Sequence, residues 1–254
     1  MSEFYNTIAR FYDAENQEMT DDLSLYSDLA EVYGQPILDV GCGTGRVMFH
    51  LAQEGYQCVG IDTSPPMLAR ARQKAASLPI LQQHTSFIQA DVASYRSPDP
   101  FRLILLPYHT FMHFRDQETQ LSVLTQLTAN LAAEGAIVFD LPNAGEAFST
   151  QDDHALAVER TFIDPHTGNV VMQQSVSSLD RVTQLLQITW IYDEISADGA
   201  VHRTIAPLIL RYVFFEELRL LLRLAKLRIS DVYGDYDQQP FADGSPRMIV
   251  VAVK

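Results

Sequence analysis

The chain has 254 residues and a formal net charge of −14, with 47% hydrophobic and 20% charged residues. This length and balance fit one α/β domain, or a domain with a modest insertion, that buries a large core. The negative charge repels phosphate backbones and argues against nucleic acid as the main partner. No apolar run approaches the roughly 20 residues of a membrane span, so no membrane partner is expected.

The cysteine content and the N-terminal composition bear on location. Cys42 and Cys58 are the two cysteines. Neither has a metal-ligand partner at close spacing, and two are too few for a disulfide framework. Met1–Asp22 mixes acidic residues, Asn and Arg with aromatic residues, unlike a signal peptide. We therefore expect a cytoplasmic protein without a bound metal.

Short apolar runs alternate with helical patterns in the first part of the chain. A helix over Asp21–Tyr33 ends at Gly34, with Pro36 beyond it. The predicted strands are Ile37–Val40, Gln57–Ile61, Phe87–Ala90, Arg102–Leu106 and Ala136–Leu141. The predicted helices between them run from the glycine turn to Gln53, from Ser64 to Ala76 with Ser64 as N-cap, and over Gln117–Leu131. This alternation predicts a parallel sheet covered on both faces.

The pattern changes after Pro142 to alternating, strand-like segments. Asp164–Gly168 and Asp198-Gly199 carry turn signals. Within Thr183–Ile195, four apolar residues fall on one face of a strand: Leu186, Ile188, Trp190 and Tyr192. This part of the chain is predicted to be an antiparallel β insertion.

Helix resumes at Phe215–Lys226, and the chain closes with two strands, Leu227–Tyr233 and Met248–Val253. We therefore expect a core made of residues 1–149 and 213–254, interrupted by a β insertion over residues 150–212.

The central motif is the glycine turn Asp39-Val40-Gly41-Cys42-Gly43-Thr44-Gly45, placed between a strand and a helix. Glycines let the backbone approach a ligand closely, and the helix N-terminus presents free N–H groups. Dinucleotides and S-adenosylmethionine both use this geometry. The dinucleotide fingerprint is G-x-G-x-x-G, whereas the glycines here run G-x-G-x-G. Asp62, at the end of the second strand, suits the ribose hydroxyls of either ligand.

A second acidic residue, Asp91, follows the third strand. A carboxylate there can accept from an adenine amino group, and the Val92 N–H can donate to the ring. With this third element, the motifs closely resemble those of the class I S-adenosylmethionine-dependent methyltransferases. The matching segments are Ile37–Gly45, Gly60–Ser64 with Met67-Leu68, and Ala90–Val92. Three motifs in family order distinguish this class from a nicotinamide oxidoreductase.

The resemblance implies a fold and a set of cofactor contacts. The fold is a Rossmann-like seven-stranded sheet whose last two strands form a reversed hairpin edge. The implied cofactor-binding residues are Asp39, Gly41, Cys42, Gly43, Gly45, Asp62, Thr63, Met67, Asp91, Val92 and Leu106. The glycine turn would pack against the methionine and ribose portion, with Asp62 on the ribose. Core packing remains an equal alternative for Met67, and turn capping remains an alternative for the three aspartates.

The acceptor site is expected beyond the carboxyl ends of the fourth and fifth strands. The aromatic segment Pro107–Phe114 contains two candidates for a base or an orienting group. His113 is the first candidate and His109 the second. For each histidine, capping of the next helix or packing against a neighbour is the alternative. In the resembling family, paired tyrosines near the N-terminus cover the cofactor, which makes Tyr12 a third candidate. An ordinary packing helix over Tyr5–Asp13 is the alternative.

The insertion resembles β-lobes of sugar-amine N-methyltransferases, which form an acceptor pocket or a dimer contact. We therefore expect methylation of a nitrogen or an oxygen of a small molecule, with nitrogen favoured, and keep a homodimer open. The alternatives are a nicotinamide-dependent oxidoreductase and a non-catalytic protein that binds the cofactor. A metal-dependent catechol-type enzyme would need a carboxylate cluster near the fourth strand, which the sequence lacks.

Overall fold

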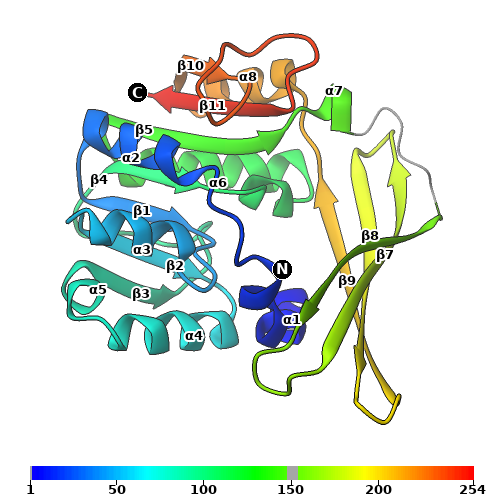
Figure 1. Cartoon of the computed structure of the whole chain (residues 1–254). Helices are drawn as coiled ribbons and strands as arrows, with labels where there is room; N and C mark the ends of the chain where they lie inside the picture. The colour runs from blue at the N-terminus through cyan, green and yellow to red at the C-terminus, as the bar shows by residue number, and fades with distance from the viewer. Residues whose placement is uncertain (1, 148–153) are drawn as a thin grey trace.

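Apolar strands and amphipathic helices assemble two sheets that lie side by side (Figure 1). The computed structural model describes residues 2–147 and 154–254. A seven-stranded, mostly parallel sheet carries helices on both faces, and a four-stranded antiparallel sheet, the β-lobe, follows the fifth strand. The α/β fold class with an antiparallel insertion, predicted from the sequence, is confirmed.

The large sheet contains β1 (Ile37–Val40), β2 (Cys58–Asp62), β3 (Thr85–Gln89), β4 (Phe101–Leu106), β5 (Leu131–Pro142), β10 (Arg228–Tyr233) and β11 (Arg247–Val253). The β-lobe contains β6 (Leu156–Ile163), β7 (Val170–Asp180), β8 (Leu185–Ile195) and β9 (Val201–Arg211). The helices are α1 (Ser2–Glu15), α2 (Leu23–Tyr33), α3 (Arg46–Gln53), α4 (Pro65–Ala76), α5 (Pro79–His84), η1 (Thr110–His113), α6 (Gln117–Asn130), α7 (Ala144–Ala147) and α8 (Phe215–Leu224).

The strand order of the large sheet is β10-β11-β5-β4-β1-β2-β3. β11 runs antiparallel to both β5 and β10, so the last two strands form the hairpin edge that the family resemblance implied. The other pairings, β5–β4, β4–β1, β1–β2 and β2–β3, are parallel. The loops after β1, β2, β3 and β4 therefore emerge at one edge of the sheet, which is where ligands bind in such folds.

Central strands are buried on both faces. Leu38 and Ile104 belong to the core packed against α6 and α8, whereas Ile37 and Leu103 belong to the core packed against α2 and α3. All four side chains are fully buried. Side chains alternate across a strand, so a strand covered by helices on both sides has a continuous apolar sequence.

Several element boundaries differ from the prediction for local reasons. β5 begins at Leu131 because this residue pairs with Phe101 ahead of a register shift. The helix predicted to continue to Lys226 ends at Leu224, and Lys226 has a left-handed φ of 63°. The predicted N-cap at Ser64 is confirmed, since its side chain accepts from the Met67 N–H at 3.5 Å.

The β-lobe is a regular meander whose inner face turns toward α1 (Figure 1). The predicted turn at Asp198-Gly199 is closed by the Ser196 N–H donating to the Ala200 oxygen at 2.9 Å. The predicted insertion begins at residue 150, and residues 150–153 lie outside the described residues. The division into two domains stays a prediction. No helix within residues 2–147 and 154–254 is both long and apolar enough to cross a membrane.

Candidate active site

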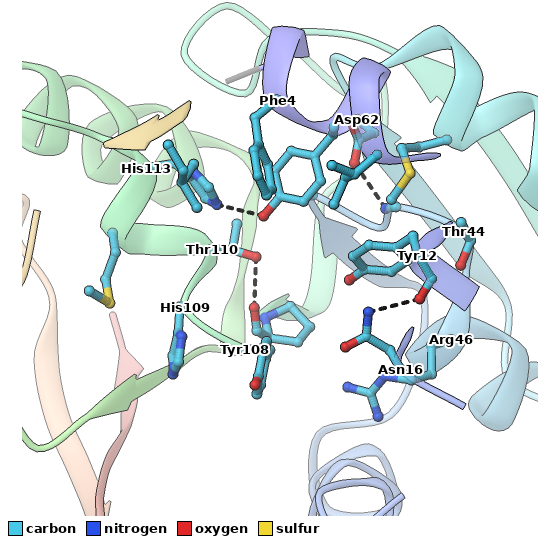
Figure 2. A pocket seen from close by; sticks show the side chains of 18 of the residues that line it. Phe4, Tyr12, Asn16, Thr44, Arg46, Asp62, Tyr108, His109, Thr110 and His113 are labelled. Atoms are coloured by element: carbon cyan, nitrogen blue, oxygen red, sulfur yellow. Dashed lines mark hydrogen bonds between the residues drawn. The ribbon is translucent and has the colours of Figure 1, made fainter. Parts of the chain in front are cut away.

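A cavity of about 380 Å³ lies between the carboxyl edge of the large sheet, α1 and the β-lobe (Figure 2). A second cavity of about 320 Å³ lies over the ends of β2 and β3. The two cavities share four lining residues: Gly41, Asp62, Thr110 and His113. We call the first the acceptor-side cavity and the second the adenine-side cavity, after the roles argued below.

The glycine turn forms one wall of the acceptor-side cavity. Gly41, Gly43 and Gly45 have φ values of +69°, +55° and +91°, a left-handed conformation that favours glycine. The Gly43 N–H donates to Asp62 Oδ2 at 2.9 Å, which fixes the turn to the end of β2. A Cβ on Gly41 would lie 3.0 Å from Thr110 Cγ2, so the bare backbone is also needed for packing.

Two carboxylates flank this turn. Asp39 is 2% exposed, lines the cavity, and its Oδ1 has no hydrogen-bond partner within the described part of the chain. Burial raises its pKa to about 7. Asp62 also lines the cavity, and its Oδ1 accepts from the Ser64 N–H at 2.8 Å. Burial raises the pKa of Asp62 as well. Both carboxylates retain lone pairs for a ligand that donates hydrogen bonds.

The adenine-side cavity is lined by Thr63, Asp91 and Val92. Thr63 Oγ1 is buried without a partner in the part of the chain that the structure describes. Asp91 is exposed, and its Oδ1 accepts from the Ala93 N–H at 2.9 Å in a tight turn. Asp91 lines the cavity beside the buried, apolar Val92. A flat heterocycle with an exocyclic amine matches this arrangement.

The predicted cofactor residues fall into two groups. Nine of them line one or both cavities: Asp39, Gly41, Cys42, Gly43, Asp62, Thr63, Met67, Asp91 and Val92. Gly45 instead caps α3, and Leu106 is fully buried in the core between β4 and the helices. The structure therefore brings together most of the residues that the motifs singled out.

α1 closes the acceptor-side cavity and is anchored to the glycine turn. Asp13 Oδ1 accepts from Thr44 Oγ1 at 2.6 Å and from Lys74 Nζ at 2.5 Å. Tyr12 lines the cavity, and burial raises the pKa of its phenol above the ordinary value. The Tyr5 hydroxyl and His113 Nε2 form a 2.9 Å hydrogen bond across the cavity (Figure 2).

Both candidate histidines line the acceptor-side cavity. Burial lowers the pKa of each imidazole to about 3, so both rings are neutral near neutral pH. His109 and Tyr108 have left-handed φ values of 68° and 40°, and their rings stack with centroids 4.5 Å apart. Asp140 of β5 stabilises this strained backbone conformation, because its Oδ2 accepts from the Tyr108 N–H at 3.0 Å.

The family resemblance named the β insertion as an acceptor pocket or a dimer contact, but sequence reasoning named none of the residues that form the other wall of this cavity. That wall contains Ile188 and Trp190 of β8, Leu208 and Leu210 of β9, and Arg160 of β6, and the end of α1 adds Glu15 and Asn16 to the lining. The apolar face of β8 was visible in the sequence, but nothing local indicated that it would face the glycine turn. Within the described ranges, no group of three or more His, Cys, Asp or Glu residues is placed to hold a metal ion.

Comparisons with known proteins agree with this geometry. The methyltransferase-domain family matches residues 37–135. The chain is 25% identical over 218 residues to the cypemycin N-terminal methyltransferase of a Streptomyces species, covering 86% of this chain and 82% of that protein. Other curated methyltransferases match over about half of their own length, from 46% to 58%.

Solved structures share the whole fold. The CcbJ methyltransferase from Streptomyces caelestis superposes with a TM-score of 0.84 at 23% identity, covering 99% of this chain and 98% of that one. The sugar N-methyltransferase KedS8 from a Streptoalloteichus species gives a TM-score of 0.75 at 19% identity, covering 96% and 91%. Its three motifs line two adjoining cavities, and residues 37–135 match the methyltransferase-domain family. Together with the similarity to the methyltransferases named above, this shows that the chain carries an S-adenosylmethionine-dependent methyltransferase domain.

Proposed function

We propose that this enzyme transfers a methyl group from S-adenosylmethionine to an amine nitrogen of a small molecule. The observation that carries the proposal is the acceptor-side cavity, whose two walls are the glycine turn and the apolar inner face of β8 and β9. Its volume of about 380 Å³ lies in the range of small-molecule sites. The net charge of −14 supports a small acceptor over nucleic acid.

The residues present fit the cofactor. The backbone of the glycine turn would hold the methionine end together with Asp39 Oδ1, which has no hydrogen-bond partner among the described residues, and Asp62 would hold the ribose hydroxyls. Thr63, Asp91 and Val92 would hold the adenine. When bound, the sulfonium supplies an activated methyl group, so the protein needs mainly to align an acceptor and exclude water.

The two histidines favour nitrogen over oxygen. An alcohol acceptor needs a base to remove its proton, and imidazoles whose pKa lies near 3 are poor bases. A neutral amine already has a lone pair and needs only to be oriented toward the methyl group. His113 is held by Tyr5, which suits an orienting role better than proton transfer. Relatives named for N-methylation, the norajmaline and sugar N-methyltransferases, support this choice.

Calorimetric titration with S-adenosylmethionine, S-adenosylhomocysteine and NADH tests the cofactor, using wild type, Asp62→Ala and the exposed control Asp99→Asn. We expect both sulfur ligands to bind and NADH not to bind. Asp62→Ala should weaken binding at least about tenfold, because charge-assisted hydrogen bonds contribute about 1.5–3 kcal/mol each. Asp99→Asn should match wild type.

Mass spectrometry of reactions with amine and alcohol panels then tests turnover. N-methylated products support the proposal. Binding of NADH alone would redirect the work to hydride transfer. Cofactor binding without any product would instead indicate a non-catalytic binding protein. The homodimer and the cytoplasmic location expected from the sequence remain proposals, to be checked by light scattering and cell fractionation.

A further inference from the structure

Most carboxylates buried at the junction of α1, the sheet and the β-lobe are paired with a cation. The pairs are Asp22–Arg46, Asp140–Arg247, Glu194–Arg10 and Glu217–Arg211. Three carboxylates that line the acceptor-side cavity differ: Asp39, Asp62 and Glu15 have no ion pair with a lysine, arginine or histidine among residues 2–147 and 154–254. Asp39 and Asp62 flank the glycine turn, so the cofactor accounts for them. The cofactor does not account for the carboxylate of Glu15, which also lines the cavity without an ion pair among the described residues.

Neutral donors from the β-lobe hold the Glu15 carboxylate in place. Gln173 Nε2 donates to Glu15 Oε1 at 2.7 Å, and the Tyr192 hydroxyl donates to Oε2 at 3.1 Å. Gln173 and Tyr192 are both fully buried. Gln173 Nε2 also donates to the Tyr192 hydroxyl at 3.1 Å, so each of Glu15, Gln173 and Tyr192 is hydrogen-bonded to the other two. An ionised carboxylate accepts about four hydrogen bonds, which leaves acceptor capacity toward the cavity.

The charges around Glu15 are few. Arg160 of β6 donates to the main-chain oxygen of Glu15 at 2.6 Å and lowers the pKa of its carboxyl, but burial outweighs this and raises that pKa overall. Among the described residues, the phenols of Tyr5, Tyr12 and Tyr192 also interact with the Glu15 charge. Within the described ranges no lysine, arginine or histidine nitrogen lies within 4.0 Å of the Glu15 carboxylate, and a cationic ligand would supply that direct ion pair.

We propose that Glu15 binds the protonated amine of the acceptor and takes its proton before methyl transfer; this inference rests on the proposed function. The ammonium N–H proton passes to Glu15, leaving a neutral amine. The amine lone pair then forms the new nitrogen–carbon bond while the carbon–sulfur bond breaks and its electron pair stays on sulfur. Glu15 afterwards releases its proton to solvent. The substrate class is therefore a primary or secondary amine that is protonated in solution, carried on an apolar skeleton facing Trp190.

The chain has one tryptophan, Trp190, and it lines the cavity, so its fluorescence reports occupancy. The probes are 2-phenylethylamine and cyclohexylmethylamine, each compared with the alcohol of the same skeleton. They are titrated into protein saturated with S-adenosylhomocysteine, using wild type, Glu15→Gln and Glu18→Gln. Glu18 is an exposed carboxylate outside the cavity and serves as the matched control.

We expect wild type and Glu18→Gln to bind each amine at least about tenfold more tightly than its alcohol, as suits a charge-assisted contact. In Glu15→Gln this preference should fall to about twofold or less, with S-adenosylhomocysteine affinity unchanged. In wild type the preference should disappear as the pH falls through the raised pKa of Glu15 and the carboxylate is protonated. Equal binding of amine and alcohol, a preference that survives in Glu15→Gln, or no binding of either amine overturns the inference.

The failure of this inference is distinguishable from the failure of the proposed function. If wild type does not bind S-adenosylhomocysteine in calorimetry, both are defeated. If that ligand binds and only alcohols are methylated, the enzyme remains a small-molecule methyltransferase, and Glu15 has lost its assigned role.

Discussion

Asp140→Asn is expected to destabilise the fold and to disturb the acceptor side of the site. Asp140 is fully buried at the end of β5 and pairs with Arg247 through Nε at 2.7 Å and also through Nη2. It accepts further hydrogen bonds from the hydroxyls of Tyr26 at 3.3 Å and Tyr236 at 3.1 Å. Removing the negative charge leaves the half-buried Arg247 cation without a counterion, which costs about 3–5 kcal/mol.

Urea unfolding monitored by circular dichroism measures this loss, with Arg247→Met and the double variant completing a cycle. Each single variant leaves one member of the pair without its partner, whereas the double variant removes both members. The sum of the two single losses of unfolding free energy should therefore exceed the loss in the double variant by about 1–3 kcal/mol. The control is Asp193→Asn, whose partner Arg203 has a side chain 55% exposed, and it should lose no more than about 1 kcal/mol. Additive losses, or an Asp140→Asn loss no larger than that of the control, would refute the reasoning.

The same variant separates the two halves of the site. Asp140 holds the strained segment after β4, through its side chain on the Tyr108 N–H and through its main-chain oxygen on the His109 N–H at 3.0 Å. The glycine turn is held by its own hydrogen bonds, from the Gly43 N–H to Asp62 and from Thr44 Oγ1 to Asp13. Asp140→Asn should therefore keep the affinity for S-adenosylhomocysteine within about twofold, while KM for an amine acceptor rises about tenfold or more as the segment relaxes.

Two further predictions concern the glycine turn and acid stability. Gly45→Ala should lose about 2–4 kcal/mol of stability in thermal unfolding, because φ is +91° and the new Cβ would lie 2.6 Å from the Phe49 ring. The control Gly55→Ala has φ +96° but open space around the new Cβ, so it should lose only the cost of the backbone conformation, about 1–2 kcal/mol. Equal losses in the two variants would contradict this account. His113 has a folded pKa of about 3, below the ordinary 6.5, so the unfolded chain binds more protons between these values and stability falls as the pH is lowered from 6.5 toward 3. His113→Asn should flatten the stability–pH slope in that window by no more than about 1.4 kcal/mol per pH unit, and an unchanged slope would show that the imidazole is not held neutral.

The cofactor wall of the site was predictable because it is local in sequence. The turn from Gly41 to Gly45 needs left-handed glycines wherever it occurs, and Asp62 and Asp91 end adjacent parallel strands, so the topology brings them to one edge. Leu106 was expected at the same edge, but it is fully buried in the core. β4 is covered on both faces, so its uniformly apolar sequence does not indicate which residue reaches the ligand.

The acceptor wall depends on contacts between distant segments and gave little local signal. The alternation of β8 identified an apolar face with Trp190, but not what that face would meet. Glu15 ends a helix and lies 158 residues from Gln173, its hydrogen-bond partner in the β-lobe. The short helix Pro79–His84 was also missed, because six residues are too few to show a helical period.

α1 makes the two walls of the site one mechanical unit. Near its end, Asp13 is tied to Thr44 of the glycine turn, while Glu15, two residues later, is tied to Gln173 of the β-lobe. Phe11, in the same turn of helix, stacks on Tyr192 of the β-lobe with ring centroids 5.0 Å apart. Because a helix is stiff over so short a span, we expect the last helical turn to set the position of a bound acceptor relative to the methyl donor. On the proposed function, alignment of the acceptor would therefore depend on a segment that contacts the glycine turn and the β-lobe and belongs to neither sheet.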